Sequence, residues 1–163
     1  MESYPHLLSI LKKDAQRVHK ADALRTNIMA VNAISEFLRT SFGPLGMNKV
    51  IINGSHELRV GRDGTAILDN LDAEHPAARI LSKVAKDQNL WIGDGVKTTI
   101  ILTAELLKLS DHLIECKVHP SIIIRGFNHA LREFEKVLNK SAIHIKNDEA
   151  MFRKVIAATM ICK

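Results

Sequence analysis

Hydrophobic residues recur at steps of three and four along most of the chain, a spacing that places them on one face of a helix. The first such run begins at Leu24 and continues at positions 28, 31, 34 and 38. It stops at Gly43 and Pro44, because glycine often takes the left-handed conformation that closes a helix and proline cannot continue one. The pattern therefore predicts an amphipathic helix followed by a tight loop over residues 41–46.

Two short runs of β-branched and other apolar residues follow this loop. Residues 50–52 read Val-Ile-Ile and residues 58–60 read Leu-Arg-Val, on either side of Asn53 and Gly54. Such runs around an Asn-Gly pair predict a hairpin whose loop is longer than two residues. No other segment of the chain has a convincing strand pattern.

Further helices are predicted after the hairpin. Asp63 precedes a short apolar stretch that reaches Leu71, and Pro76 stands where a first-turn proline begins a helix. A strongly apolar helix over about residues 97–116 follows the loop at residues 91–95. His75 and His119 each precede a proline, and we interpret both as helix N-caps rather than metal ligands.

The last two predicted helices begin at Pro120 and after Asn147 or Asp148, either of which is a suitable N-cap. Both helices carry apolar residues at helical spacing, which we expect to be buried, and we expect Trp91 to pack into the core or over its loop. The residues expected inside are Ile123, Ile124, Phe127, Leu131, Phe134 and Leu138 on one helix and Met151, Phe152, Val155 and Ile156 on the other.

Composition narrows the class of protein. With 163 residues and 46% hydrophobic content the chain can bury a core, as one domain or part of one. The formal net charge of +5 suits phosphate-bearing partners, but the basic residues are spread along the chain and aromatic residues make up only 4%. A small basic nucleic-acid binder is an alternative that rests on the charge alone, so we expect no nucleic-acid partner.

The sequence also bears on the compartment. No apolar run reaches membrane-spanning length, and the first residues lack the basic region and long apolar region of a secretory signal. Cys116 and Cys162 lie far apart in helix-like segments, which favours two reduced cysteines over a disulfide or a metal-ligand pair. We therefore expect a cytoplasmic protein with no membrane partner.

Residues 93–99, Gly-Asp-Gly-Val-Lys-Thr-Thr, are the most informative segment for chemistry. The start of a helix presents unpaired N–H groups and the positive end of the helix dipole, which together attract anions. Asp94 would repel a phosphate unless a cation lay between them, so it suits a Mg²⁺ ligand that bridges to nucleotide oxygens. The alternative is that Asp94 is only an N-cap and the glycines only a turn. The common P-loop pattern is absent.

Two other motifs are ambiguous when each is taken alone. Residues 43–46, Gly-Pro-Leu-Gly, suit a helix stop as well as a loop that cradles a ligand. Asp63 before Gly64 suits an acidic group that orients a water or holds a metal, but Asp-Gly is also a frequent turn.

Five blocks, taken together, resemble the group II chaperonins, the thermosome and eukaryotic cytosolic type, in order and spacing. The blocks are residues 43–49, 62–68, 74–79, 93–98 and 118–120, and the resemblance runs from about Arg25 to the C-terminus. It implies a mainly α fold, the helical bundle of a chaperonin equatorial domain with one small hairpin. Residues 1–24 would be an N-terminal extension and residues 25–163 the N-terminal half of that nucleotide-binding domain, with the intermediate and apical domains absent.

The resemblance implies a site for ATP or ADP with Mg²⁺. Gly43 and Pro44 would contact the nucleotide, Asp94 would coordinate Mg²⁺, and Asp63 would lie near the γ-phosphate and support hydrolysis. The remaining implied nucleotide-binding residues are Gly95, Lys97, Thr98, Thr99 and, at the position of a γ-phosphate sensor, Lys163.

This chain departs from the family pattern in its phosphate loop. Val96 and Lys97 replace two threonines, so a hydroxyl donor is lost, and Arg62 replaces an asparagine before Asp63. Lys97 would either supply a positive charge to the phosphates or turn to solvent as a surface lysine. The family's principal water-activating aspartate belongs to the intermediate domain, so hydrolysis by this chain is in doubt.

The resulting hypothesis is an ATP-binding part of a chaperonin subunit that assists protein folding in a multi-subunit ring. Residues 49–60 match the hairpin that pairs with a neighbouring subunit, and unfolded substrates would be bound only by the absent domains. A structural or assembly protein with a vestigial nucleotide site is the alternative. A half-domain would also expose apolar helix faces, so we expect poor solubility or oligomers when the chain is alone.

Overall fold

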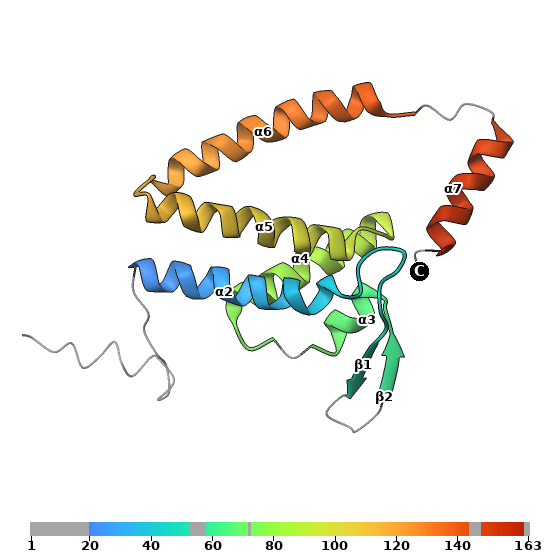
Figure 1. Ribbon diagram of the computed structural model, residues 1–163, viewed down its shortest axis with the longest axis horizontal. Coiled ribbons are helices and arrows are strands. Elements are labelled where there is room, and N and C mark those ends of the chain that lie inside the picture. Colours follow the sequence, from blue (N-terminus) through green and yellow to red (C-terminus); the bar gives the residue numbers. More distant parts are fainter. Residues whose placement is uncertain (1–19, 53–57, 72, 144–147, 162–163) are drawn as a thin grey trace, which may run out of the picture.

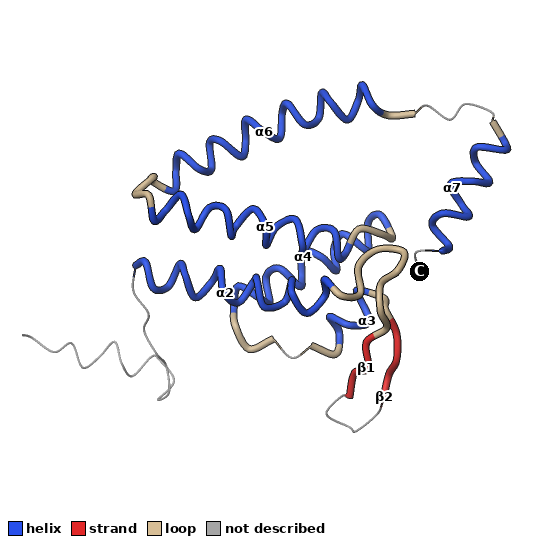
Figure 2. Tube along the Cα trace, viewed as in Figure 1, coloured by secondary structure: helices blue, strands red, loops and turns tan. Residues whose placement is uncertain are grey.

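The computed structural model describes residues 20–52, 58–71, 73–143 and 148–161. Within these residues the protein is mainly α-helical with one two-stranded sheet, as predicted (Figures 1 and 2). The elements are α2 (Lys20–Arg39), β1 (Lys49–Ile52), β2 (Leu58–Gly61), α3 (Gly64–Asp69), α4 (Pro76–Ile92), α5 (Val96–Glu115), α6 (Pro120–Ser141) and α7 (Glu149–Ile161). None of the helices in these residues combines the length and the hydrophobicity of a membrane-spanning segment.

Helices α3, α4, α6 and α7 begin where the sequence predicts, whereas α2 begins at Lys20, four residues before the predicted start at Leu24. Nδ1 of His75 accepts a hydrogen bond from the backbone N of Ala77 at 3.2 Å, and Nδ1 of His119 does the same for Ser121. The prediction that both histidines are N-caps is therefore confirmed. Asp148 caps α7, because its Oδ1 accepts from the backbone N of Met151 at 3.1 Å.

The hairpin is antiparallel, as predicted. Val50 pairs with Val60 and Ile52 pairs with Leu58, so residues 53–57, which lie outside the described residues, connect the strands. These four apolar residues are 58% to 65% exposed. Within the described chain each strand has a neighbouring strand on one side only.

The hydrophobic core lies between α2, α3, α4 and α5, which we call the core unit. α2, α4 and α5 pack against one another, and α3 closes one end near the hairpin (Figure 1). The buried cluster consists of Val31, Ile34, Leu38, Ile67, Leu68, Ala78, Leu81, Ala85, Val96, Ile100 and Ala104. Side chains of α2 and α5 also pair outside the core, where Arg25 bonds Glu115 at 2.9 Å and Arg39 bonds Glu105.

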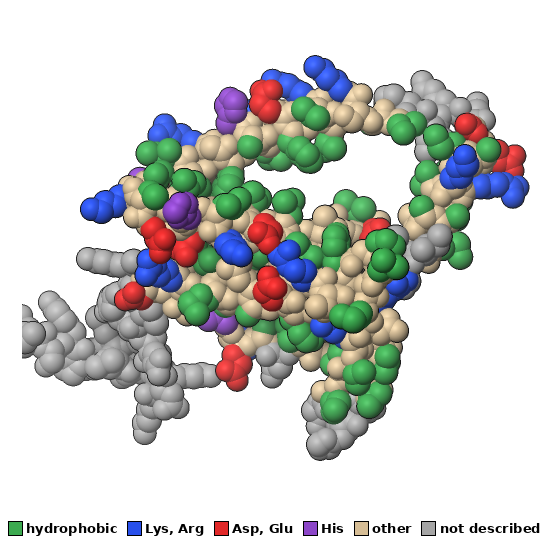
Figure 3. Space-filling view, viewed as in Figure 1, with side chains coloured by type: hydrophobic (Ala, Val, Ile, Leu, Met, Phe, Trp, Pro, Cys, Tyr) green, Lys and Arg blue, Asp and Glu red, His purple; other side chains and the backbone are tan. Residues whose placement is uncertain are grey.

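Helices α6 and α7, which we call the arm, do not bury the face predicted for them. Of the residues expected inside, only Ile123 is buried; Met151 is half-buried and the others are 38% to 58% exposed. The reason is geometric: α6 leaves α5 after the turn at residues 116–119, and α7 lies apart from the core unit (Figure 1). Hydrophobic side chains therefore gather along the facing edges of α5 and α6 (Figure 3).

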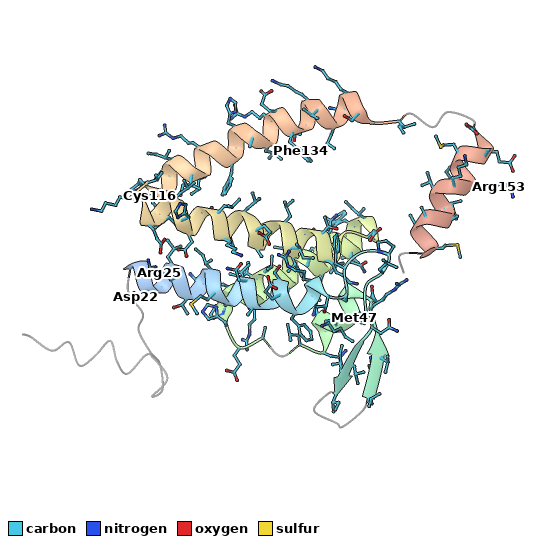
Figure 4. All side chains as sticks on the ribbon, in the orientation of Figure 1. Asp22, Arg25, Met47, Cys116, Phe134 and Arg153 are labelled. Atoms are coloured by element: carbon cyan, nitrogen blue, oxygen red, sulfur yellow. The ribbon has the colours of Figure 1, made fainter. Side chains whose placement is uncertain are left out.

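Two single residues illustrate the same difference. Phe134, on the side of α6 that faces α5 (Figure 4), is 57% exposed because α6 diverges from α5 along its length. Trp91 is 84% exposed at the end of α4, so the expectation that it packs into the core is wrong. Cys116, which ends α5, is exposed and free of a disulfide among the described residues; Cys162 lies outside them.

Candidate functional site

A cleft of about 250 Å³ opens where the loop after α2, the start of α3, the end of α4 and the first turn of α5 meet. Three stretches that are far apart in the sequence, residues 42–43, 62–64 and 89–98, thus contribute to one site. Its lining residues are Phe42, Gly43, Arg62, Asp63, Gly64, Asn89, Gly93, Asp94, Gly95, Val96, Lys97 and Thr98.

The floor of the cleft is the N-terminus of α5. Gly93 ends α4 and Gly95 precedes α5, both with positive φ angles of 81° and 87° that side chains rarely tolerate. Because the N-cap of α5 is glycine, no side chain caps the first turn, and the first intrahelical bond there is made by Thr99 N to Gly95 O at 2.9 Å. Such a helix start offers backbone N–H groups to an anion.

Two carboxylates flank this helix start, and both are exposed. Asp63 caps α3, where its Oδ2 accepts bonds from the backbone N of Ala66 at 3.1 Å and from the hydroxyl of Thr65. Asp94 accepts from the backbone N of Gly95 at 2.7 Å through Oδ1. The alternative that Asp94 is the N-cap of α5 is wrong, because Gly95 holds that position and no side chain caps the helix. Both aspartates line the cleft, and their contacts with a metal or a phosphate stay predictions.

The donor set suits a metal that arrives with a phosphate ligand. The described residues contain no group of three or more His, Cys, Asp or Glu side chains placed to hold a metal ion alone. Mg²⁺ needs no such cage, since one or two carboxylates, water and substrate phosphates commonly complete its octahedron. Asp94 and Asp63 are the residues that fit this requirement here.

Lys97 crosses the cleft wall. Its Nζ donates a hydrogen bond to the backbone O of Ser41 at 2.6 Å, so the first turn of α5 is tied to the loop after α2. Burial lowers the pKa of Lys97 from its ordinary value; the carboxylate of Asp63 opposes that shift and the cation of Arg62 adds to it. The side chain is thus bonded inside the protein rather than turned to solvent, while its contact with phosphate stays a prediction.

Val96 belongs to the core as much as to the cleft. Its side chain is only 6% exposed and lies against Gly64, where an added Cβ would come within 2.9 Å of Val96 Cγ1. Glycine at position 64 therefore lets α3 approach α5 closely, and this contact positions Asp63 beside the helix start. From the sequence alone, Val96 was interpreted only as a replacement of the family threonine that removes a hydroxyl group.

The structure brings together six of the predicted site residues, namely Gly43, Asp63, Asp94, Gly95, Lys97 and Thr98. Pro44 and Thr99 do not line the cleft: the carbonyl of Pro44 accepts from Nη1 of Arg62 at 3.4 Å, and the hydroxyl of Thr99 donates to Gly95 O at 2.9 Å. Lys163 lies outside the described residues.

Six lining residues were not predicted as site residues. Arg62, Gly64, Gly93 and Val96 stand within the sequence motifs, whereas Phe42 and Asn89 stand outside them. Phe42 immediately precedes Gly43, so its place in the loop was the available signal. Asn89 lies on the last turn of α4, where its carbonyl accepts from Gly93 N at 2.8 Å. Its position four residues before a helix-ending glycine places it near the loop, but no motif marks it.

By fold and site, this is a mainly helical domain whose cleft joins glycine turns, a helix start and two carboxylates. The sequence pattern of the TCP-1/cpn60 chaperonin family matches residues 34–163. The chain belongs to this family, and the resemblance inferred from its motifs is confirmed.

Archaeal thermosome subunits are among its relatives. The chain is 40% identical to the thermosome subunit beta of Aeropyrum pernix over 152 residues, which are 93% of this chain and 28% of that protein. It is 42% identical to the thermosome subunit beta of Desulfurococcus mucosus over 91% of this chain and 30% of that protein. The thermosome subunit alpha of Archaeoglobus fulgidus is 38% identical over 93% of the chain. The chain thus spans less than a third of the length of these relatives.

Proposed function

We propose that the cleft binds the phosphates of ATP or ADP together with Mg²⁺, as the nucleotide-binding part of a group II chaperonin subunit that assists protein folding. The observation that carries the proposal is the convergence of three separate stretches of the sequence on one cleft around the uncapped start of α5. Membership of the chaperonin family supports the same assignment. The proposal concerns binding, and hydrolysis is a separate property that release of inorganic phosphate would measure.

The proposed roles follow from the charges. Backbone N–H groups of the first turn of α5 would donate to phosphate oxygens. Asp94 would hold Mg²⁺ between its carboxylate and those oxygens, and Asp63 would face the terminal phosphate from the start of α3. Lys97 and Arg62 would offset part of the remaining negative charge.

Isothermal titration calorimetry of the chain with ATP, with and without Mg²⁺, tests this proposal. We expect Asp94→Ala to weaken binding by at least about tenfold when Mg²⁺ is present, since a charge-assisted contact is lost. Without Mg²⁺ we expect Asp94→Ala to bind no more weakly than the unaltered chain, because a repulsive carboxylate has been removed.

Asp87→Ala is the matched control, because Asp87 is an exposed aspartate of α4 that does not line the cleft. It should leave the affinity unchanged in both conditions. Equal affinities of all three proteins for Mg-ATP would contradict the metal role of Asp94, and no heat of binding at all would contradict the nucleotide site.

We also propose that the chain assembles with other chaperonin-family subunits through residues 49–60. In support, the described strands carry exposed Val50, Ile52, Leu58 and Val60, and each strand has a partner strand on one side only. Such edges are completed in many proteins by another chain. If the chain assembled with other subunits but bound no nucleotide, the alternative of a structural or assembly protein with a vestigial nucleotide site would be favoured.

Size-exclusion chromatography with light scattering tests the assembly surface. We expect the paired substitutions Val50→Lys and Val60→Lys to reduce co-elution with a thermosome subunit beta, since opposed lysines repel across the hairpin and against an incoming strand. The control is Leu131→Lys on α6, which alters an exposed apolar residue away from the hairpin. If both variants reduced co-elution equally, the hairpin would not be the assembly surface.

A fluorescence titration with RNA and DNA, which should show no salt-dependent binding, checks the expected lack of a nucleic-acid partner.

A further inference from the structure

The hydrogen bond between Lys97 and Ser41 joins two helix ends of opposite polarity. Ser41 lies just after α2, where the partial negative charge of helix carbonyls attracts a cation. Lys97 itself lies on the first turn of α5, where the partial positive charge disfavours a cation but attracts an anion. The carbonyl at the α2 end is therefore a favourable acceptor for the ammonium, and in this structure its Nζ is 2.6 Å from Ser41 O.

A phosphate at the start of α5 would change this balance. The ammonium would then have a second acceptor that carries a full negative charge, so a Coulomb attraction between opposite charges would add to the hydrogen bond. Lys97 lines the same cleft as that helix start, so its stem need not move to another face of α5. The four-carbon side chain with three donors can redirect its head group without a change in the helix.

We propose that Lys97 is a two-position cation that bonds the Ser41 carbonyl when the cleft is empty and transfers to phosphate when the cleft is filled. This inference rests on the proposed nucleotide site and assigns a positioning role in it to a residue at which the chain departs from its family pattern. Phosphate binding would thereby release the loop after α2 from the first turn of α5.

Ser41 is a suitable anchor for the ligand-free position. It is 1% exposed, its backbone N and its hydroxyl both bond the carbonyl of Leu38, at 3.0 and 2.8 Å, and Leu38 is itself fully buried. The carbonyl is thus held in place by the end of α2 and does not follow the ammonium when that leaves. A ligand shifts such an equilibrium only through its different affinity for the two positions, and here the phosphate contacts one of them alone.

The carbonyl carbon of Ser41 also reports directly on whether the hydrogen bond from Lys97 is present, through its NMR chemical shift. In an isotope-labelled chain its ¹³C′ chemical shift is followed for the unaltered protein and for Lys97→Met, each with and without Mg-ATP. We expect Mg-ATP to move the unaltered protein toward the value that Lys97→Met shows without ligand. Lys97→Met itself should not respond to Mg-ATP at this carbon, because the bond is already absent.

Calorimetry on the same samples separates the two proposals. Lys97→Met should bind Mg-ATP about tenfold more weakly, since a charged hydrogen bond is lost while the cost of leaving Ser41 is avoided. Lys97→Arg keeps a cation and should stay within a few-fold of the unaltered chain, a rescue that a merely structural lysine would not predict. Lys136→Met, on α6 and away from the cleft, is the matched control.

Some outcomes would contradict only the two-position role of Lys97, and others would contradict the nucleotide site as well. If Mg-ATP binds but Ser41 keeps its ligand-free shift, or if Lys97→Met leaves the Ser41 shift unaltered, the two-position role is wrong and the nucleotide site stands. If the unaltered chain does not bind Mg-ATP at all, the nucleotide site and the two-position role are both wrong.

Discussion

The core unit and the arm have the same kind of sequence pattern, but the core unit buries its apolar residues and the arm leaves most of them exposed. Ile100 in α5 and Leu131 in α6 are both apolar residues on an apolar helical stripe, yet Ile100 is fully buried and Leu131 is 55% exposed. Periodicity specifies which face of a helix is apolar. It does not specify whether a partner for that face exists in the same chain, and in the arm the described residues supply almost none.

The largest test of this comparison is truncation of one apolar residue in each region. We expect Ile100→Ala to lower the free energy of unfolding by about 2–5 kcal/mol, because it leaves a cavity among packed neighbours. Leu131→Ala should change it by less than about 0.5 kcal/mol, since more than half of this residue is already exposed to water. Urea unfolding followed by circular dichroism measures both, and similar losses would mean that the arm packs in solution.

Glycine replacements should have effects of opposite sign in the two regions. At Gly64 a new Cβ would come within 2.9 Å of Val96, so Gly64→Ala should destabilise the core unit by about 1–3 kcal/mol through overpacking. At Gly126, inside α6, nothing lies within 4 Å of the new Cβ. Gly126→Ala should therefore raise the stability of that helix by about 0.5–1 kcal/mol.

Thermal unfolding of these two glycine variants is the measurement. A fall in the midpoint for Gly64→Ala with a rise in helix content for Gly126→Ala is expected. A loss of stability at position 126 would show that α6 packs closely against another surface at that point.

Loss of a helix cap should lower the global stability of the protein when the cap lies in the core unit. In the arm it should lower only the local helix content. Asp63→Ala removes the cap of α3 and should cost about 0.5–2 kcal/mol in global stability. Asp148→Ala removes the cap of α7 and should lower helix content without moving the global transition, because α7 lies outside the core unit. Urea melts read alongside the native far-ultraviolet signal distinguish the two, and a global loss for Asp148→Ala would join α7 to the core.

The smallest expected effects are those of exposed ion pairs. Arg25→Gln breaks the ion pair between Arg25 and Glu115, and both of these side chains are about half exposed. The substitution should lower the free energy of unfolding by less than about 1 kcal/mol. Arg153→Gln breaks the pair with Glu149 within α7 and should leave the global transition unchanged. Melts at low and high salt measure the difference, and the Arg25 effect should fade as salt screens it.

The sequence was informative wherever local chemistry decides the structure. The histidine–proline helix starts, the Asp63 cap and the hairpin all follow from backbone geometry within a few residues, and all are present. The loop predicted at residues 91–95 is shorter, because α4 continues to Ile92. The motifs also indicated six of the residues that line the cleft.

Contacts between distant segments were not predictable in the same way. The bond from Lys97 to Ser41 joins residues 56 positions apart, and the contact of Val96 with Gly64 depends on how α3 meets α5. The exposure of the arm was missed for the same reason, since a side chain's burial is decided by the element across from it. A single periodic pattern contains no information about that element.

The placement of the core cluster along the chain has a consequence for biosynthesis. Its members run from Val31 to Ala104, so all of them have been translated before α6 begins at Pro120. Domains tend to fold from the N-terminus as the ribosome adds roughly 5–20 residues per second. The core unit can therefore close while the arm is still being made, and the apolar faces of α6 and α7 emerge a few seconds later beside a neighbour that is already folded.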